Sequence, residues 1–317
     1  MIAKAFQKFN YTSLIVSSIL LMGVSYYYTT VDIIWSFFES KILNGIIVFG
    51  AFMLTIYSID TVTRQLTIER ANRNAYHLLL YPLVIFSFPL ESLDMRFILG
   101  SAAIWSAWRN TRLFVETVNN QEKIKRLLDA VLLVTISSVL ILENIFFLIV
   151  PILILFAGNI NIDIKYFIII IGTPIIMIPT INVILTFLNL DSLLFSSYLF
   201  NTSDRLEISM FSNFVVPFSF WPLVLVIFYF LIAVILKLRK TVSFQRRLLD
   251  ITGVVFFILF ITFFITNQNI SGSEFHYLSL ILVYFISQIF TIKINSIYVN
   301  LIFISIIAST FIFKFII

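Results

Sequence analysis

Apolar segments of similar length recur along almost the whole chain, and they limit what it can fold into. A helix that crosses a membrane needs about 20 apolar residues. The 317 residues are 60% hydrophobic and 12% charged, whereas soluble domains carry about 25% charged residues. The sequence therefore predicts an all-α, polytopic transmembrane helical bundle, with 1–317 as a single integral membrane domain and 1–158 and 159–317 as its candidate halves. The predicted spans are 11–31, 42–62, 74–90, 96–117, 164–187, 213–236, 248–266, 275–290 and 297–316.

A further apolar block at 127–158 is too long for one ordinary helix and short for two. Basic residues cluster at 109–126 and 237–247, and cytoplasmic loops concentrate Lys and Arg. With both clusters inside, the block must cross the membrane twice or not at all. We expect two short helices that turn near Glu143, with a re-entrant hairpin as the alternative. The result is about eleven spans, with the N-terminus inside and the C-terminus outside, and 17 of the 21 Lys and Arg facing the cytoplasm.

The motif RLLD occurs twice, at 126–129 and at 247–250. Each copy lies at the predicted cytoplasmic start of a helix. We interpret the two arginines as interface anchors. We expect Asp129 and Asp250 to lie in the first helical turn, where a carboxylate satisfies free backbone amides. An internal duplication is the alternative interpretation.

Segment 96–117 carries the main candidate binding site. Trp105, Arg109, Arg112 and Glu116 follow spacings of four, three and four, so they share one face of a helix. An arginine inside a membrane is costly and suggests function, and guanidinium groups bind phosphate oxygens bidentately. The alternative is that Glu116 pairs with Arg112 while Arg109 extends to lipid headgroups. The predicted residues for an anionic lipid or ligand are Arg96, Trp105, Trp108, Arg109, Arg112 and Arg205.

Paired acids in the predicted outer turn FPLESLDMRF offer candidate catalytic residues. Glu91 and Asp94 lie close in sequence to Arg96. In a transferase that acts on lipid-linked sugars, one carboxylate would act as a base and the other would bind the sugar or a metal. Ordinary acidic loop residues are the alternative. His276, two residues after Glu274, is a second candidate general base, with a lone interfacial histidine as its alternative.

Segment 171–182, IGTPIIMIPTIN, predicts a bent or broken helix. Pro174 and Pro179 lack backbone N–H groups and free carbonyls that need partners. Broken helices line cavities in transporters, while a packing kink is the alternative. Only one such segment is clear in the sequence, which counts against a transporter. The outer segment 188–212 is predicted to contain a short interfacial helix.

Several chemistries lack support in the sequence. The chain has no cysteine and only two histidines, so no metal site and no cofactor are predicted. Nucleic-acid binding is not expected, because topology already explains the basic residues at the helix ends. Glycine-rich phosphate loops and hydrolase motifs are also absent from the sequence.

The stretch from WRNTRLF through KIKRLLDAVLLVTISSVLILENIFFLIVPILIL resembles a family of polytopic inner-membrane proteins of Bacteroidota with no assigned function. That family has a short basic N-terminus before its first helix, as in KAFQKFNYTSLIVSSILLMG, and a basic pair that ends the fourth helix. Arg109, Arg112, Lys125, Arg126 and Asp129 match the family pattern, although Asn110 and Thr111 separate the basic pair. The resemblance implies a multi-pass protein of the bacterial inner membrane and supplies no catalytic residues. The layout is also similar to O-antigen polymerases and multi-spanning glycosyltransferases.

Two functions are consistent with these features. The first is an inner-membrane protein of the cell envelope that handles a lipid-linked glycan, such as a polyprenyl-linked one, or another anionic lipid in an intramembrane cavity. The alternative is a non-enzymatic transmembrane subunit or scaffold of a larger envelope or secretion complex, with membrane proteins as partners. The sequence does not decide whether the protein is an enzyme.

Overall fold

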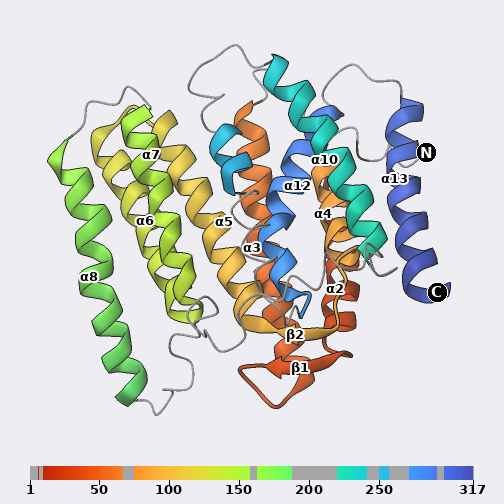
Figure 1. Ribbon diagram of the computed structural model, residues 1–317, viewed down its shortest axis with the longest axis horizontal. Helices are drawn as coiled ribbons and strands as arrows, with labels where there is room; N and C mark the ends of the chain where they lie inside the picture. The colour runs from red at the N-terminus through yellow and green to blue at the C-terminus, as the bar shows by residue number, and fades with distance from the viewer. Residues whose placement is uncertain are drawn as a thin grey trace, which may run out of the picture. The chain divides into compact units, whose positions relative to one another are not determined.

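The computed structural model describes residues 6, 10–66, 75–157, 163–187, 220–240, 250–256, 271–290 and 296–316. Nearly all of them are helical (Figure 1), which confirms the all-α class. The structure also describes two short strands, β1 (Asp32–Trp35) and β2 (Ser92–Asp94), which pair in parallel. The chain divides into two compact units, each of which combines segments from before and after residue 158. Unit 1 comprises Met1–Met95, Leu206–Thr241 and Asn269–Ile317, and unit 2 comprises Arg96–Arg205 and Val242–Gln268.

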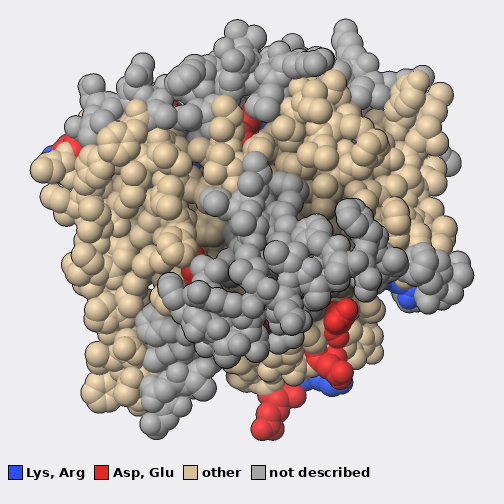
Figure 2. Space-filling view, in the orientation of Figure 1, with Lys and Arg blue, Asp and Glu red and all other residues tan. Residues whose placement is uncertain are grey.

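Three described helices are long and apolar enough to cross a membrane. They are Lys41–Thr63, Ile164–Phe187 and Ile297–Lys314, whose most apolar windows have mean hydropathies of 2.0, 2.3 and 1.9. On the face drawn in Figure 2, charged side chains are sparse among the described residues, as contact with lipid requires. These helices indicate that the protein associates with a membrane. The count of eleven spans and the orientation of the termini stay predictions.

Unit 1 is built around one fully enclosed helix, α12 (His276–Ile289), of whose 14 residues 13 are buried. A helix that is apolar on all sides belongs in the centre of a bundle. Helices α3, α4 and α10 pack against α12, and α2 packs against α3 and α4 (Figure 1). The other helices of unit 1 are α2 (Tyr11–Tyr28), α3 (Lys41–Leu66), α4 (Tyr76–Phe86), α10 (Trp221–Lys240) and α13 (Ser296–Phe311), which continues as a π-helical turn, η7 (Ile312–Ile316).

Hydrogen bonds join the segment around β2 to the segment around the short 3-10 helix η6 (Ser273–Phe275) in unit 1. The amides of Glu91 and Ser92 both donate to the carbonyl of Ser271, at 3.1 Å. The Ser273 hydroxyl accepts from the Asp94 amide at 3.0 Å and donates to the Ser92 carbonyl at 3.1 Å. Residues about 180 positions apart are thereby fixed against each other.

Unit 2 contains α5 (Met95–Glu116), α6 (Asn120–Leu140), η2 (Leu142–Leu148), α7 (Ile149–Ala157), α8 (Ile164–Phe187) and the helical residues 250–256. Leu127 and Leu155 belong to one core cluster although Glu143 lies between them, so the chain doubles back near Glu143, as the sequence predicts. The Asn144 amide group holds this turn by donating to the carbonyl and the hydroxyl of Ser137, at 3.2 and 2.7 Å. The remaining members of the cluster are Phe114, Val131, Tyr166 and Ile170.

Helix α8 runs without a break through Pro174 and Pro179, so a broken helix at 171–182 is wrong, while a bend or packing kink there stays a prediction. Membrane helices tolerate proline when other groups satisfy the nearby carbonyls, and the Thr180 hydroxyl donates to the Ile176 carbonyl at 2.7 Å. The predicted interfacial helix within 188–212 lies outside the described residues.

The predicted helix-start role of Asp129 is also wrong. Helix α6 begins at Asn120, and the side chain of Asn119 caps it by accepting from the Gln121 amide at 2.9 Å. Asp129 therefore lies in the third turn of α6, too far along the helix to reach a free amide. For Asp250, the preceding residues are outside the described part of the chain.

We expect Asn119→Ala to destabilise unit 2 by about 1 kcal/mol, because the variant loses the side-chain cap of α6. Asp129→Asn should change the stability by less than about 0.5 kcal/mol, since that carboxylate caps nothing. Thermal unfolding of both variants in the same detergent measures the difference. An equal loss for both variants would contradict the assignment of the cap.

Candidate functional site

Helix α5 carries the predicted anion-binding stripe, and two of its four residues, Trp105 and Arg112, are fully buried. The side chains of Trp105 and Arg112 are 0% exposed, and Trp108 is 4% exposed. Arg109 is half-buried and Glu116 is exposed. The periodicity of the sequence therefore placed these residues on one helix correctly, but Arg109 is the more accessible of the two central arginines.

Two tryptophans and one arginine form the centre of the stripe. The rings of Trp105 and Trp108 meet edge to face, with their centroids 6.0 Å apart. The guanidinium carbon of Arg112 lies 5.5 Å from the centroid of the Trp108 ring, within the range of a cation–π interaction. One turn earlier on α5, the Arg109 Nη2 group donates to Asn110 Oδ1 at 3.5 Å, which is long for a hydrogen bond.

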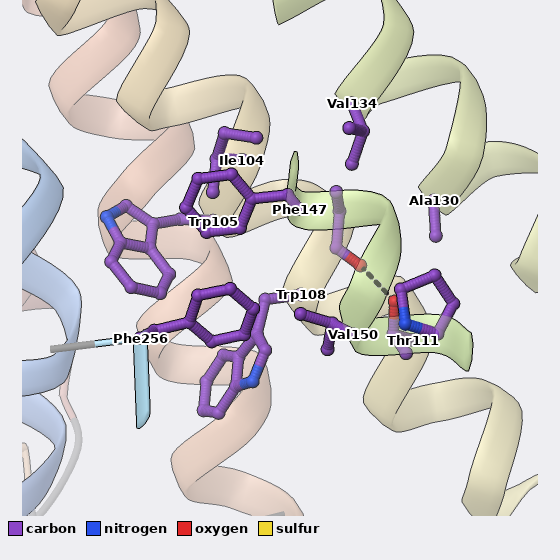
Figure 3. Close-up of a pocket in the computed structure, with 11 residues that line it drawn as sticks. Ile104, Trp105, Trp108, Thr111, Ala130, Val134, Phe147, Val150 and Phe256 are labelled. Atoms are coloured by element: carbon purple, nitrogen blue, oxygen red, sulfur yellow. Dashed lines mark hydrogen bonds between the residues drawn. The ribbon is translucent and has the colours of Figure 1, made fainter. Parts of the chain in front are cut away.

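A small pocket lies beside these tryptophans within unit 2 (Figure 3). Phe147 and Phe256 stack on each other in its wall, with centroids 4.6 Å apart. The Thr111 hydroxyl at its edge already donates to the Ala107 carbonyl at 2.9 Å. The free space is about 10 Å³, close to the minimum for one water molecule. The pocket therefore has no room for a sugar or a phosphate.

The other predicted site residues are distributed over the chain. Arg96 lies at the start of α5, about 20 Å along the helix from Arg109 at 1.5 Å per residue. Glu91 is exposed, whereas Asp94 is 1% exposed and belongs to β2. Arg205 lies outside the described residues. Glu91 and Asp94 belong to unit 1, and the predicted anion-binding residues that the structure describes belong to unit 2.

Glu274 and His276, the predicted acid–histidine pair, form their hydrogen bonds with different residues. The Glu274 carboxylate accepts from the amide and the hydroxyl of Ser271, at 3.1 and 3.0 Å. Burial raises the pKa of Glu274, and these hydrogen bonds oppose the shift. His276 Nε2 instead lies 3.0 Å from the Tyr28 hydroxyl, and its ring stacks on Phe52. His276 is thus a core residue of unit 1.

One pair that the sequence analysis did not single out joins α3 and α4. His77 Nε2 lies 3.2 Å from Asp60 Oδ1, and both side chains are largely buried. The sequence did offer one signal of this pair, because the carboxylate of Asp60 lies inside the predicted span 42–62. Within the described residues, no group of three His, Asp or Glu side chains is placed to hold a metal ion.

Comparison of the chain with protein-family models, with curated proteins and with solved structures gives no match. The function must therefore be argued from the residues and contacts above.

Proposed function

We propose that this chain is a multi-pass protein of the bacterial inner membrane that binds an anionic lipid, such as a lipid-linked glycan, through its phosphate group at Arg109. The observation that carries the proposal is a half-buried guanidinium group next to a fully buried one, Arg112, on a helix of a membrane-associated protein. A low dielectric strengthens the attraction of both groups for an anion.

The two arginines have different roles in this proposal. Arg112 contacts the Trp108 ring and contributes positive charge from within the packed unit. Arg109 has exposed surface and a planar group that matches two phosphate oxygens. The apolar pocket beside Trp105 is too small for a glycan. In this proposal the phosphate is recognised by the guanidinium group of Arg109 and not by that pocket, and the catalytic roles of Glu91 and Asp94 stay predictions.

A non-enzymatic transmembrane subunit is the second candidate, and one observation favours it. Only 11% of the most apolar window of α8 is buried inside the structure, and Ile168, Ile171 and Ile175 are among its exposed side chains. The apolar helix of a partner subunit would pack on this face in such a complex.

Lipid retention by Arg109→Leu tests the proposed function. The purified variant should retain at least tenfold less phosphatidylglycerol or polyprenyl phosphate than the wild type, because hydrogen bonds to charged groups contribute about 1.5–3 kcal/mol. Native mass spectrometry, with each lipid added separately, distinguishes the two sources of phosphate.

Arg126→Leu is the matched control, because Arg126 is a partly exposed basic residue of the same unit that already pairs with Glu122 at 3.3 Å. It should retain lipid as the wild type does. Equal retention by both variants would remove Arg109 as the site. A polypeptide bound in fixed stoichiometry, without lipid, would favour the subunit.

A further inference from the structure

The core of unit 1 contains a series of buried polar side chains that the proposed lipid site does not use. We name this series the polar column. Each member is at most 8% exposed. The members come from η6 and from four helices, α2, α3, α4 and α12, which pack together in unit 1 (Figure 1). They are Glu274, His276, Tyr28, Tyr81, Thr55, Ser279, His77 and Asp60.

One end of the polar column is the pair of Asp60 and His77. Their facing atoms lie 3.2 Å apart, within reach of proton exchange between a carboxylate and an imidazole. The other ring nitrogen of His77, Nδ1, has no hydrogen-bond partner among the described residues. It is therefore available to exchange a proton with a water molecule or a moving side chain.

The middle of the polar column is centred on Tyr81. Tyr81 lies four residues after His77 on α4, so the two share a helix face about 6 Å apart along the axis. Its hydroxyl lies close to the hydroxyls of Thr55 of α3 and Ser279 of α12, each of which donates to a backbone carbonyl of its own helix. The hydroxyl groups of three helices therefore meet one turn above the His77 ring.

The other end of the polar column begins at His276, three residues before Ser279. His276 Nε2 lies 3.0 Å from the Tyr28 hydroxyl, which donates to the Ile85 carbonyl at 3.2 Å. In this arrangement Nε2 donates and the Tyr28 oxygen accepts. Glu274 follows, with its carboxylate oriented by Ser271. The spacing from His77 to Ile85 on α4 is two helical turns, about 12 Å.

The composition of the polar column distinguishes it from ordinary packing. Ionisable residues within membrane segments are rare, and chains of acids and histidines mark proton relays. Here each end contains a carboxylate and an imidazole, and buried hydroxyl groups lie between the two ends. The predicted topology places Glu274 at the outer side and the loop between α3 and α4 at the cytoplasmic side, so the column extends from one face towards the other.

We propose that unit 1 conducts protons across the membrane along the polar column. A proton enters at the Glu274 and His276 end. At each step one O–H or N–H bond breaks as another forms on the next group or on an intervening water molecule, and one proton leaves at the Asp60 and His77 pair. The net change is the movement of one proton, so the path requires no oxidant, reductant or second substrate.

Proton flux into liposomes tests this proposal with Tyr81→Phe. The full-length chain is reconstituted in phosphatidylcholine–phosphatidylglycerol liposomes that contain pyranine, and a potassium gradient with valinomycin drives proton entry. The wild type should acidify the lumen at least tenfold faster than protein-free liposomes. Tyr81→Phe, which removes one hydroxyl from the middle of the column, should lower the added rate at least tenfold.

Tyr76→Phe is the matched control, since it removes the same group from the same helix. The Tyr76 ring packs on Phe290 and Phe303, outside the column, so its flux should equal that of the wild type. Asp60→Asn is a second test variant in case Tyr81→Phe fails to fold, which thermal unfolding reveals, and it should also lower the flux. A wild type no faster than protein-free liposomes, or wild-type flux in either folded test variant, would overturn the proposal.

Discussion

Gly272→Ala is expected to unfold unit 1 or to lower its stability by about 4 kcal/mol or more. Gly272 has a backbone φ of +88°, a left-handed conformation that costs a residue with a side chain about 1–2 kcal/mol. A Cβ atom at this position would also lie 1.9 Å from the Pro89 carbonyl oxygen and 2.8 Å from Leu90 Cα. Both are backbone atoms, so no side-chain rotation relieves the overlap.

The matched control is Gly50→Ala within α3, where an added Cβ meets no atom within 4 Å. Alanine is favoured over glycine in a helix by about 0.5–1 kcal/mol, so this variant should be as stable as the wild type or slightly more stable. Thermal unfolding in detergent measures both variants. A wild-type transition for Gly272→Ala would show that Gly272 does not pack against Pro89 and Leu90 as described.

The tight packing at Gly272 matters for the polar column as well. Ser271 and Glu274 lie on either side of this glycine and are joined by two hydrogen bonds. Displacement of the turn would therefore displace the carboxylate at the outer end of the column. The stability of this turn thus depends on the backbone contact of Gly272 with Pro89 and Leu90, which the apolar pattern of the sequence does not predict.

The positions of the helices could be predicted from the sequence because apolar length is a strong local signal. Helix α8 occupies the predicted range 164–187, and α12 differs from the prediction of 275–290 by one residue at each end. The start of α6 could not be found in this way. Its first two turns are mostly polar and are capped by Asn119, so a search for apolar residues begins too late.

The arrangement of the candidate site could be predicted only in part. The spacing of Trp105, Arg109 and Arg112 fixes their common face on α5, but spacing does not say what packs on that face. Burial of Arg112 depends on distant residues of unit 2. The polar column is a similar case, because Asp60, Tyr81 and Ser279 become neighbours only when three helices pack. Contacts between residues that are far apart in the sequence cannot be read from local sequence patterns.

Trp105→Ala is expected to destabilise unit 2 by about 3–5 kcal/mol, the usual cost of removing a fully buried tryptophan. Trp105 is 0% exposed and lies against Trp108 in the wall of the small pocket (Figure 3). The pocket now has room for about one water molecule. Loss of the indole ring would leave a much larger apolar cavity whose lining atoms lose their contacts.

Trp105→Phe should cost less than Trp105→Ala, because a six-membered ring fills part of the space. Trp221→Ala is the control, since Trp221 is 46% exposed at the start of α10, and it should cost about 1 kcal/mol or less. Thermal unfolding of the three variants in one detergent ranks their losses of stability. If Trp105→Ala and Trp221→Ala lost the same stability, the indole of Trp105 would not be the packed centre of unit 2. The orientation of Arg112 over Trp108 would then need another cause.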